Sequence, residues 1–156
     1  MNDSGARPAR VLRQFRQVFN SVKTHFQQVE KKAGIGGAQI WALSVIRARP
    51  RIGVNDLSRA MDIHQSTASN LVRALVASEM IVAEKSRSDR RSVQLRILPA
   101  GSRVLRRAPG PLAGVLPEAL ERLDARTLAR LERDLARLIA LLRADERGAG
   151  IPLADM

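Results

Sequence analysis

Apolar residues recur every three or four positions over most of this chain, which predicts a mainly helical protein. The first predicted helix runs from Arg10 to about Lys32. Its apolar side forms a narrow seam that consists of Val11, Phe15, Val18, Val22, Phe26 and Val29. A seam of this width suits the packing of one helix against another. Three closely spaced glycines end the helix, and a second helix is predicted over residues 38–49, before a proline.

The middle of the chain is predicted to hold two short helices and a hairpin. Residues 55–61 and 65–80 have the spacing of amphipathic helices, with a short turn at Asp62 between them. Two strands, Ile81–Lys85 and Val93–Ile97, then flank a loop rich in arginine and serine. The second strand alternates apolar and polar residues, as a half-buried strand does. This order of elements predicts a helix–turn–helix followed by a β-hairpin.

The C-terminal third of the chain returns to helical spacing. A short helix is predicted over 102–108 and a long one over 124–143, with a proline and glycine break at 109–111 and a frayed tail at 148–156. The long helix has a leucine seam of its own, made of Leu128, Leu131, Leu135, Leu138 and Leu142. The core of the central segment is too small to cover the apolar seams of both terminal helices. We therefore expect two chains to pair through these seams in a two-fold dimer. The alternative is that both seams pack within one chain.

The second helix of the central pair carries polar side chains that packing does not require. The candidates for contacts to bases and phosphates are Gln65, Ser66, Thr67, Asn70 and Arg73. Asparagine and glutamine can read adenine and arginine can read guanine, each through two hydrogen bonds. The hairpin loop adds four further candidates, Arg87, Asp89, Arg90 and Arg91. A polar helix beside a cationic loop fits duplex DNA, although each of these residues has a solvated surface position as its alternative.

The net charge agrees with a polyanionic partner. It is +12 at pH 7, and all but four of the 27 basic residues are arginine, whose planar guanidinium suits bidentate contacts to phosphate or guanine. A genome-wide arginine bias would give the same excess, so the charge alone does not decide the partner.

Several other classes of protein are not expected. The chain has no cysteine, and its two histidines, His25 and His64, have no partners at metal-ligand spacing, so we predict no metal and no other cofactor. It has no phosphate-cradling glycine loop and no nucleophile–base pair, so we predict no enzyme. The sequence lacks an apolar secretory signal and any run of about 18 apolar residues, which predicts a cytoplasmic protein without a membrane partner.

Residues 38 to about 105 resemble the MarR family of winged helix–turn–helix regulators. The resemblance is carried by the segments 55–61 and 65–72 and, above all, by Asp89-Arg90-Arg91, the alternating strand and the helix-opening segment Pro99-Ala100-Gly101. Leu98 departs from the family pattern because a threonine usually caps the following helix there. Asp62 also departs, since a glycine is frequent in this turn, but aspartate tolerates the left-handed conformation.

The resemblance implies a mainly α-helical fold with a small β-hairpin wing and long N- and C-terminal dimerisation helices. We expect an N-terminal dimerisation helix at 10–33, a winged helix–turn–helix DNA-binding domain at 38–108 and C-terminal dimerisation helices at 112–145. It also implies that Arg91 pairs with Asp89 and that a wing arginine enters a narrow minor groove, where negative potential is concentrated.

The function that the resemblance implies is sequence-specific DNA binding by a homodimeric transcription regulator, usually a repressor. Its operator would be pseudo-palindromic, with half-sites about 10 base pairs apart. Family members commonly bind a small aromatic or phenolic ligand, and the candidate pocket residues here are His25, Phe26, Trp41 and Val45, with simple core packing as the alternative. The alternative functions are a non-specific architectural DNA-binding protein and a helical dimer that binds a protein partner.

Overall fold

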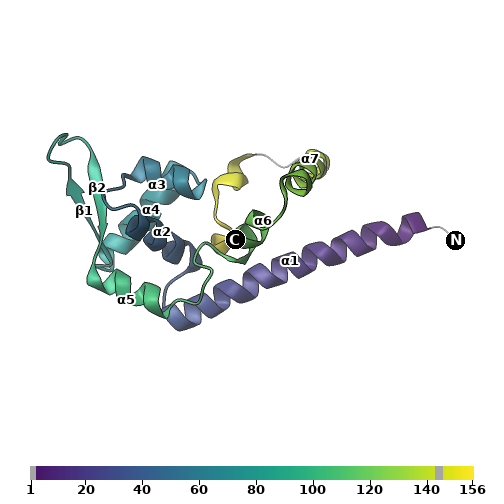
Figure 1. Cartoon of the computed structure of the whole chain (residues 1–156), viewed down its shortest axis with the longest axis horizontal. Coiled ribbons are helices and arrows are strands. Elements are labelled where there is room, and N and C mark those ends of the chain that lie inside the picture. The colour runs from purple at the N-terminus through teal and green to yellow at the C-terminus, as the bar shows by residue number, and fades with distance from the viewer. Residues whose placement is uncertain (1–2, 143–145) are drawn as a thin grey trace.

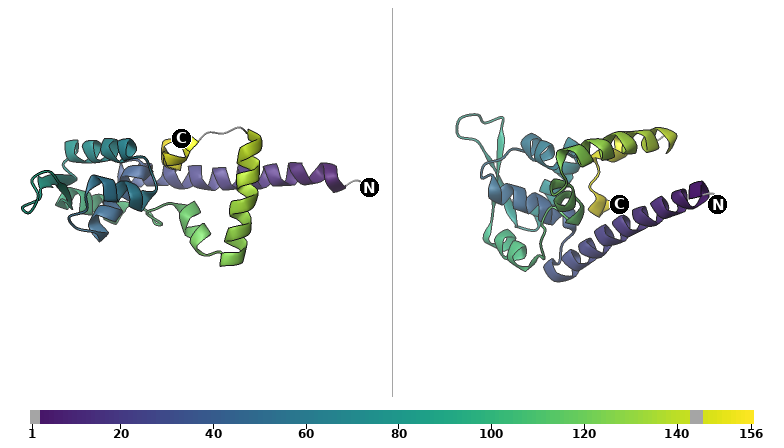
Figure 2. Two further views of the ribbon diagram at one scale, coloured as in Figure 1. Left: turned by 90° about the horizontal axis from the view of Figure 1, so that it is seen from above. Right: turned by 45° about the vertical axis from the view of Figure 1, so that its right-hand side comes forward.

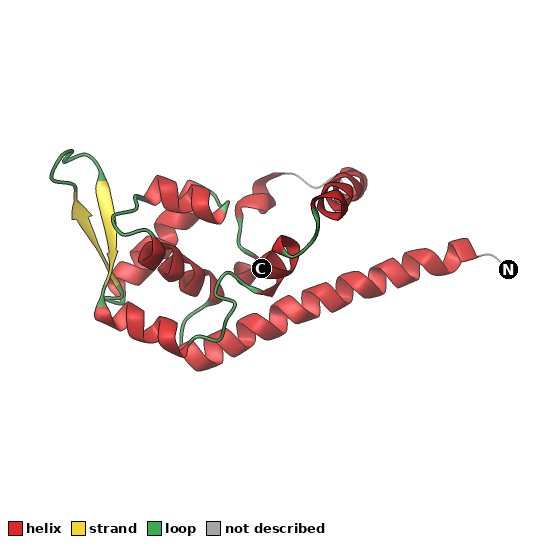
Figure 3. Cartoon of the chain, in the orientation of Figure 1, coloured by secondary structure: helices red, strands yellow, loops and turns green. Residues whose placement is uncertain are grey.

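The computed structural model of the chain describes residues 3–142 and 146–156. Within these residues the fold combines helices with one two-stranded sheet (Figures 1 and 3). The elements in chain order are α1 (Asp3–Ala33), α2 (Gly37–Ala48), α3 (Val54–Met61), α4 (Gln65–Ala77), β1 (Ile81–Lys85), β2 (Val93–Ile97), α5 (Pro99–Arg107), α6 (Val115–Glu121), α7 (Ala125–Leu142), η1 (Glu146–Gly150) and η2 (Leu153–Asp155). The predicted winged helix–turn–helix is therefore confirmed.

The core lies between the C-terminal end of α1, the helices α2, α3, α4 and α5, and the hairpin, with α2 at its centre. Its largest fully buried side chains are Ile40, Leu43, Ile46, Leu57, Met61, Leu75, Ile81, Leu95 and Val29. Full burial of each aliphatic side chain of this size contributes roughly 1.5–3 kcal/mol to folding. This core fixes α4 and the hairpin side by side.

The hairpin is antiparallel, with its register running from Ile81 opposite Ile97 to Lys85 opposite Val93. An isolated bridge also joins Ile52, in the turn before α3, to Leu95 on β2. The hairpin is thus anchored both to the end of α4 and to the beginning of α3.

Two of the helix boundaries follow from single residues. Asp62 ends α3 in the left-handed conformation, with φ 52° and ψ 48°, as its place in the turn predicted. Leu98 supplies no side-chain cap to α5, and that helix begins directly with Pro99. Proline suits this first position because the N–H that it lacks would have no partner within the helix there. The helix predicted over 102–108 therefore starts earlier than the spacing alone indicated.

Two sequence predictions need correction. The helix predicted over 65–80 ends at Ala77, because Glu79 takes the left-handed conformation, with φ 56°, and turns the chain into β1. The predicted frayed tail instead forms η1 and η2, and Pro152 between them is buried. The predicted end of the last helix, at residue 143, and the end of the 112–145 segment lie outside the described residues.

The two long terminal helices have large exposed apolar surfaces. The C-terminal half of α1 packs on the core through Val22 and Val29, but its N-terminal half projects away from it (Figures 1 and 2). Phe19 is 59% exposed on α1, and Leu142 is 67% exposed on α7. No helix in the described ranges is both long and apolar enough to cross a membrane.

Candidate nucleic-acid interface

Helix α4 presents one buried face and one polar face. Ala68, Leu71, Val72 and Leu75 are buried against the core. On the other side of the helix, Gln65, Ser66, Asn70 and Arg73 are exposed and Thr67 is half-buried. The five predicted contact residues therefore share the accessible side of a single rigid element.

Arg73 and Asn70 interact on this face. Arg73 donates a hydrogen bond from Nη1 to Oδ1 of Asn70, 3.1 Å away and one turn earlier on the helix. This bond leaves the NH2 group of Asn70 and the other guanidinium donors of Arg73 available, and it orients both side chains.

The wing loop between β1 and β2 is shaped by Asp89. Its Oδ1 accepts a hydrogen bond from the backbone N–H of Arg91 at 2.9 Å, and its carbonyl oxygen accepts one from the Ser92 hydroxyl at 3.0 Å. Asp89 thus pairs with Arg91, as expected, but through the backbone N–H of Arg91 and not through its guanidinium group. An aspartate readily makes this bond to the N–H two residues ahead. It leaves the exposed guanidinium groups of Arg87, Arg90 and Arg91 facing solvent.

Ser86 holds the beginning of the wing loop against β2. It is 4% exposed, and its Oγ accepts hydrogen bonds from the N–H of Ser88 at 3.3 Å and from Nε2 of Gln94 at 3.4 Å. Its backbone N–H donates to the carbonyl oxygen of Ser92 at 2.9 Å. The loop therefore leaves the sheet in a defined conformation.

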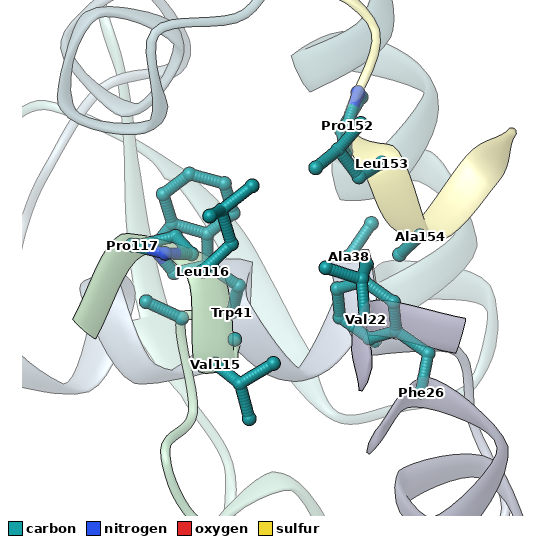
Figure 4. A pocket seen from close by; sticks show the side chains of 13 residues that line it. Val22, Phe26, Ala38, Trp41, Val115, Leu116, Pro117, Pro152, Leu153 and Ala154 are labelled. Atoms are coloured by element: carbon teal, nitrogen blue, oxygen red, sulfur yellow. The ribbon is translucent and has the colours of Figure 1, made fainter. Parts of the chain in front are cut away.

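An apolar cavity lies between α1, α2, α6 and the C-terminal segment (Figure 4). Of the four predicted pocket residues, Phe26 and Trp41 line it. His25 and Val45 are not among its lining residues. His25 is 7% exposed, its Nε2 lies 3.1 Å from the carbonyl oxygen of Pro111, and Val45 packs against the hydrophobic core.

The cavity also has walls that sequence reasoning missed. These are Leu116 and Pro117 from α6 and the segment Pro152–Ala154 from the C-terminal tail. This tail is too short to show a helical or strand periodicity, so its apolar residues did not indicate in the sequence that they would line a cavity. In the part of the chain that is described, no three histidine, aspartate or glutamate residues are placed to hold a metal ion.

The central part of the chain matches the model of one known family. Residues 33–92 match the model of the MarR family, a segment that extends from the end of α1 to the end of the wing loop. The resemblance to the MarR family is confirmed. No curated protein sequence matches the chain.

Solved structures extend the likeness to a MarR-type fold along most of the chain. A MepR-like protein complexed with pseudoligands has a TM-score of 0.57 at 14% identity, with 91% of this chain and 97% of that one covered. The multiple antibiotic-resistance repressor MarR from Listeria monocytogenes has a TM-score of 0.52 at 19% identity, with 92% of this chain and 99% of that one covered. Streptococcus pneumoniae FabT in complex with DNA has a TM-score of 0.56 at 16% identity, with 86% of this chain and 96% of that one covered. At these identities the likeness establishes the fold.

Proposed function

We propose that this chain is a transcription regulator that binds duplex DNA as a homodimer. The observation that carries the proposal is the juxtaposition of the exposed polar face of α4 with a wing loop whose three arginines are exposed. The net charge of +12 supports it, and so does the solved structure of FabT in complex with DNA, which has a similar fold.

In this proposal the two parts of the site have different tasks. Gln65, Ser66, Thr67, Asn70 and Arg73 contact base edges and phosphates in a major groove. Arg87, Arg90 and Arg91 contact the neighbouring minor groove and its phosphates, while Asp89 keeps the loop in shape. Two-fold symmetry then requires a pseudo-palindromic operator with half-sites about 10 base pairs apart.

The proposed dimer forms through the terminal helices. An open apolar hollow between them is lined from α1 by Val11, Leu12, Phe15 and Phe19 and from α7 by Leu138 and Leu142. A second copy of the chain would cover these side chains with its own terminal helices. Residues 10–33 and 112–145 would thus form the dimerisation region, and residues 38–108 the DNA-binding domain.

We also propose that a small ligand regulates DNA binding. A small aromatic or phenolic molecule would bind beside Phe26 and Trp41 and release the protein from an operator that it represses. A structure of similar fold is that of a repressor, and another contains pseudoligands. The ligand must prefer the conformation whose half-site spacing does not fit DNA, because equal binding to both conformations shifts nothing.

Gel shifts on the protein's own promoter region and on random duplex test the central claim. We expect a preference for the operator of roughly 10³ or more. Arg91→Ala should weaken operator binding by about 5- to 150-fold, which is roughly 1–3 kcal/mol, without dissociating the dimer, because Arg91 is exposed on the wing. Arg103→Ala, which removes an exposed arginine from α5, is the control and should bind as the wild type does. Equal affinity for all duplexes would favour the architectural alternative, and no DNA binding by an intact dimer would favour the protein-interaction alternative.

A further inference from the structure

A groove at the base of the wing includes Arg87, which is assigned to DNA above, and extends from it to residues that have no assigned contact. It is lined by Arg51 from the turn between α2 and α3, and by Lys85, Ser86 and Arg87 from the end of β1 and the start of the wing loop. Arg51 is fixed there by its backbone, because its N–H donates to the carbonyl oxygen of Leu95 on β2 at 3.1 Å. A residue from outside the hairpin therefore becomes part of the wing surface.

The groove has a surplus of positive charge. Arg51, Lys85 and Arg87 are exposed, and none of them forms an ion pair or a side-chain hydrogen bond with any described residue. Arg96, a fourth cation in the lining, is compensated because its Nη2 lies 2.8 Å from Oε1 of Glu84. Three positive charges thus border one groove without an internal partner.

The backbone at Arg51 adds a second observation. Arg51 has φ 72°, a conformation that glycine adopts freely but that costs an L-residue roughly 1 kcal/mol or more. Backbone strain of this kind clusters at functional sites. The chain places a long cationic side chain at a position where the backbone itself favours glycine.

We propose that this groove binds a phosphate of the DNA backbone next to the wing, with Arg51 as its main contact. The proposal rests on the DNA binding proposed above and adds a contact that carries no sequence information. A guanidinium suits this ligand because its fork can donate two hydrogen bonds to a phosphodiester. The buried Ser86, between Lys85 and Arg87 in the chain, accepts hydrogen bonds from Ser88 and Gln94 and so fixes the backbone where the wing loop borders the groove.

The first test compares Arg51→Gly with the wild type over a range of salt concentrations. Glycine removes the charge and accepts the left-handed backbone, so the fold should be kept. We expect operator and random duplex to lose affinity equally, by roughly three- to tenfold, and the slope of log K against log salt to fall by about 1. Arg51→Lys should restore much of that slope. Arg49→Ala is the charge-matched control, since Arg49 is exposed two residues earlier and does not line the groove, and its slope should equal that of the wild type.

The second test identifies the phosphate. Single uncharged methylphosphonate linkages are placed along the operator, and each duplex is titrated with both proteins. We expect one linkage beside the wing to weaken the wild type but to leave Arg51→Gly unaffected, as a double-mutant cycle requires of a direct contact. An unchanged salt slope in Arg51→Gly, or equal losses for both proteins at every linkage, would overturn the groove proposal. Failure of the proposed function looks different, because the wild type would then show no preference for the operator.

Discussion

At the scale of single residues, Gly101 shows how one missing side chain positions a whole helix. A Cβ at this position would collide with the carbonyl oxygen of Met80 and would lie 3.0 Å from Cγ1 of Ile97. The absence of that Cβ lets the first turn of α5 lie directly on the chain between α4 and β1. The glycine that marked the beginning of this helix in the sequence is therefore required by packing and not by a left-handed backbone.

Gly101→Ala should lower the free energy of unfolding by roughly 1–3 kcal/mol, the usual cost of overpacking. Alanine's better helix propensity, worth about 1 kcal/mol, offsets part of this cost. Urea denaturation followed by circular dichroism measures the change. Gly36→Ala is the control, because a Cβ at Gly36 meets no atom within 4 Å and should change stability by less than about 0.5 kcal/mol. Equal stability of the two variants would show that α5 can shift without cost.

At the scale of elements, the sequence predicted the helices and strands whose pattern of apolar and polar residues is local. The strands Ile81–Lys85 and Val93–Ile97 have the predicted bounds, and the buried face of α4 was evident from helical spacing. The places of Arg51 in the wing groove and of Pro152 in the cavity wall were not predictable, because both depend on contacts between segments far apart in the sequence. The sequence also did not show that Asp89 would bind Arg91 through the backbone N–H of Arg91 and not through its guanidinium group.

The C-terminal segment connects the cavity to the first residues of α4. Pro152, Leu153 and Ala154 form part of the cavity wall, and the carbonyl oxygen of Gly150 accepts a hydrogen bond from the N–H of His64 at 3.1 Å. His64 is the N-cap of α4 and supplies no side-chain cap. A Cβ on Gly150 would overlap the imidazole ring of His64. The segment therefore stabilises the beginning of α4 through its backbone.

Gly150→Ala should displace the segment from α4, because the added methyl group and the imidazole ring of His64 would occupy the same space. We expect the backbone amide of His64 to exchange its hydrogen roughly tenfold faster, since exchange reports local opening. Gly148→Ala tests the same substitution two residues earlier, where a Cβ would meet nothing within 4 Å, and should leave this exchange unchanged. Equal protection of His64 in all three proteins would show that the Gly150 contact does not hold this end of α4.

At the scale of the whole molecule, the distribution of apolar surface is uneven. The lobe that contains α2 to α5 buries most of its large aliphatic residues, whereas Leu12 on α1 and Leu141 and Leu142 on α7 are at least half exposed. The N-terminal half of α1 extends away from that lobe (Figure 2). On α1, Phe15 and Phe19 stack with their ring centroids 6.3 Å apart at the edge of the hollow between α1 and α7. An exposed apolar surface of this kind marks a site of association, and the proposed two-fold dimer would use it.

Phe19→Asp should convert the dimer to monomers, because it places a charge without a partner in the hollow that the second chain would fill. Sedimentation velocity measures the mass, and circular dichroism checks that the lobe stays folded. Operator affinity should fall at least 100-fold, because the two half-sites are no longer bound by linked copies of α4. Val76→Asp is the matched control, since Val76 is 39% exposed on α4, outside the hollow, and its variant should remain dimeric. If Phe19→Asp sediments as the wild type does, the chains associate through another surface or not at all, and the spacing of the operator half-sites must then be set by something other than α1 and α7.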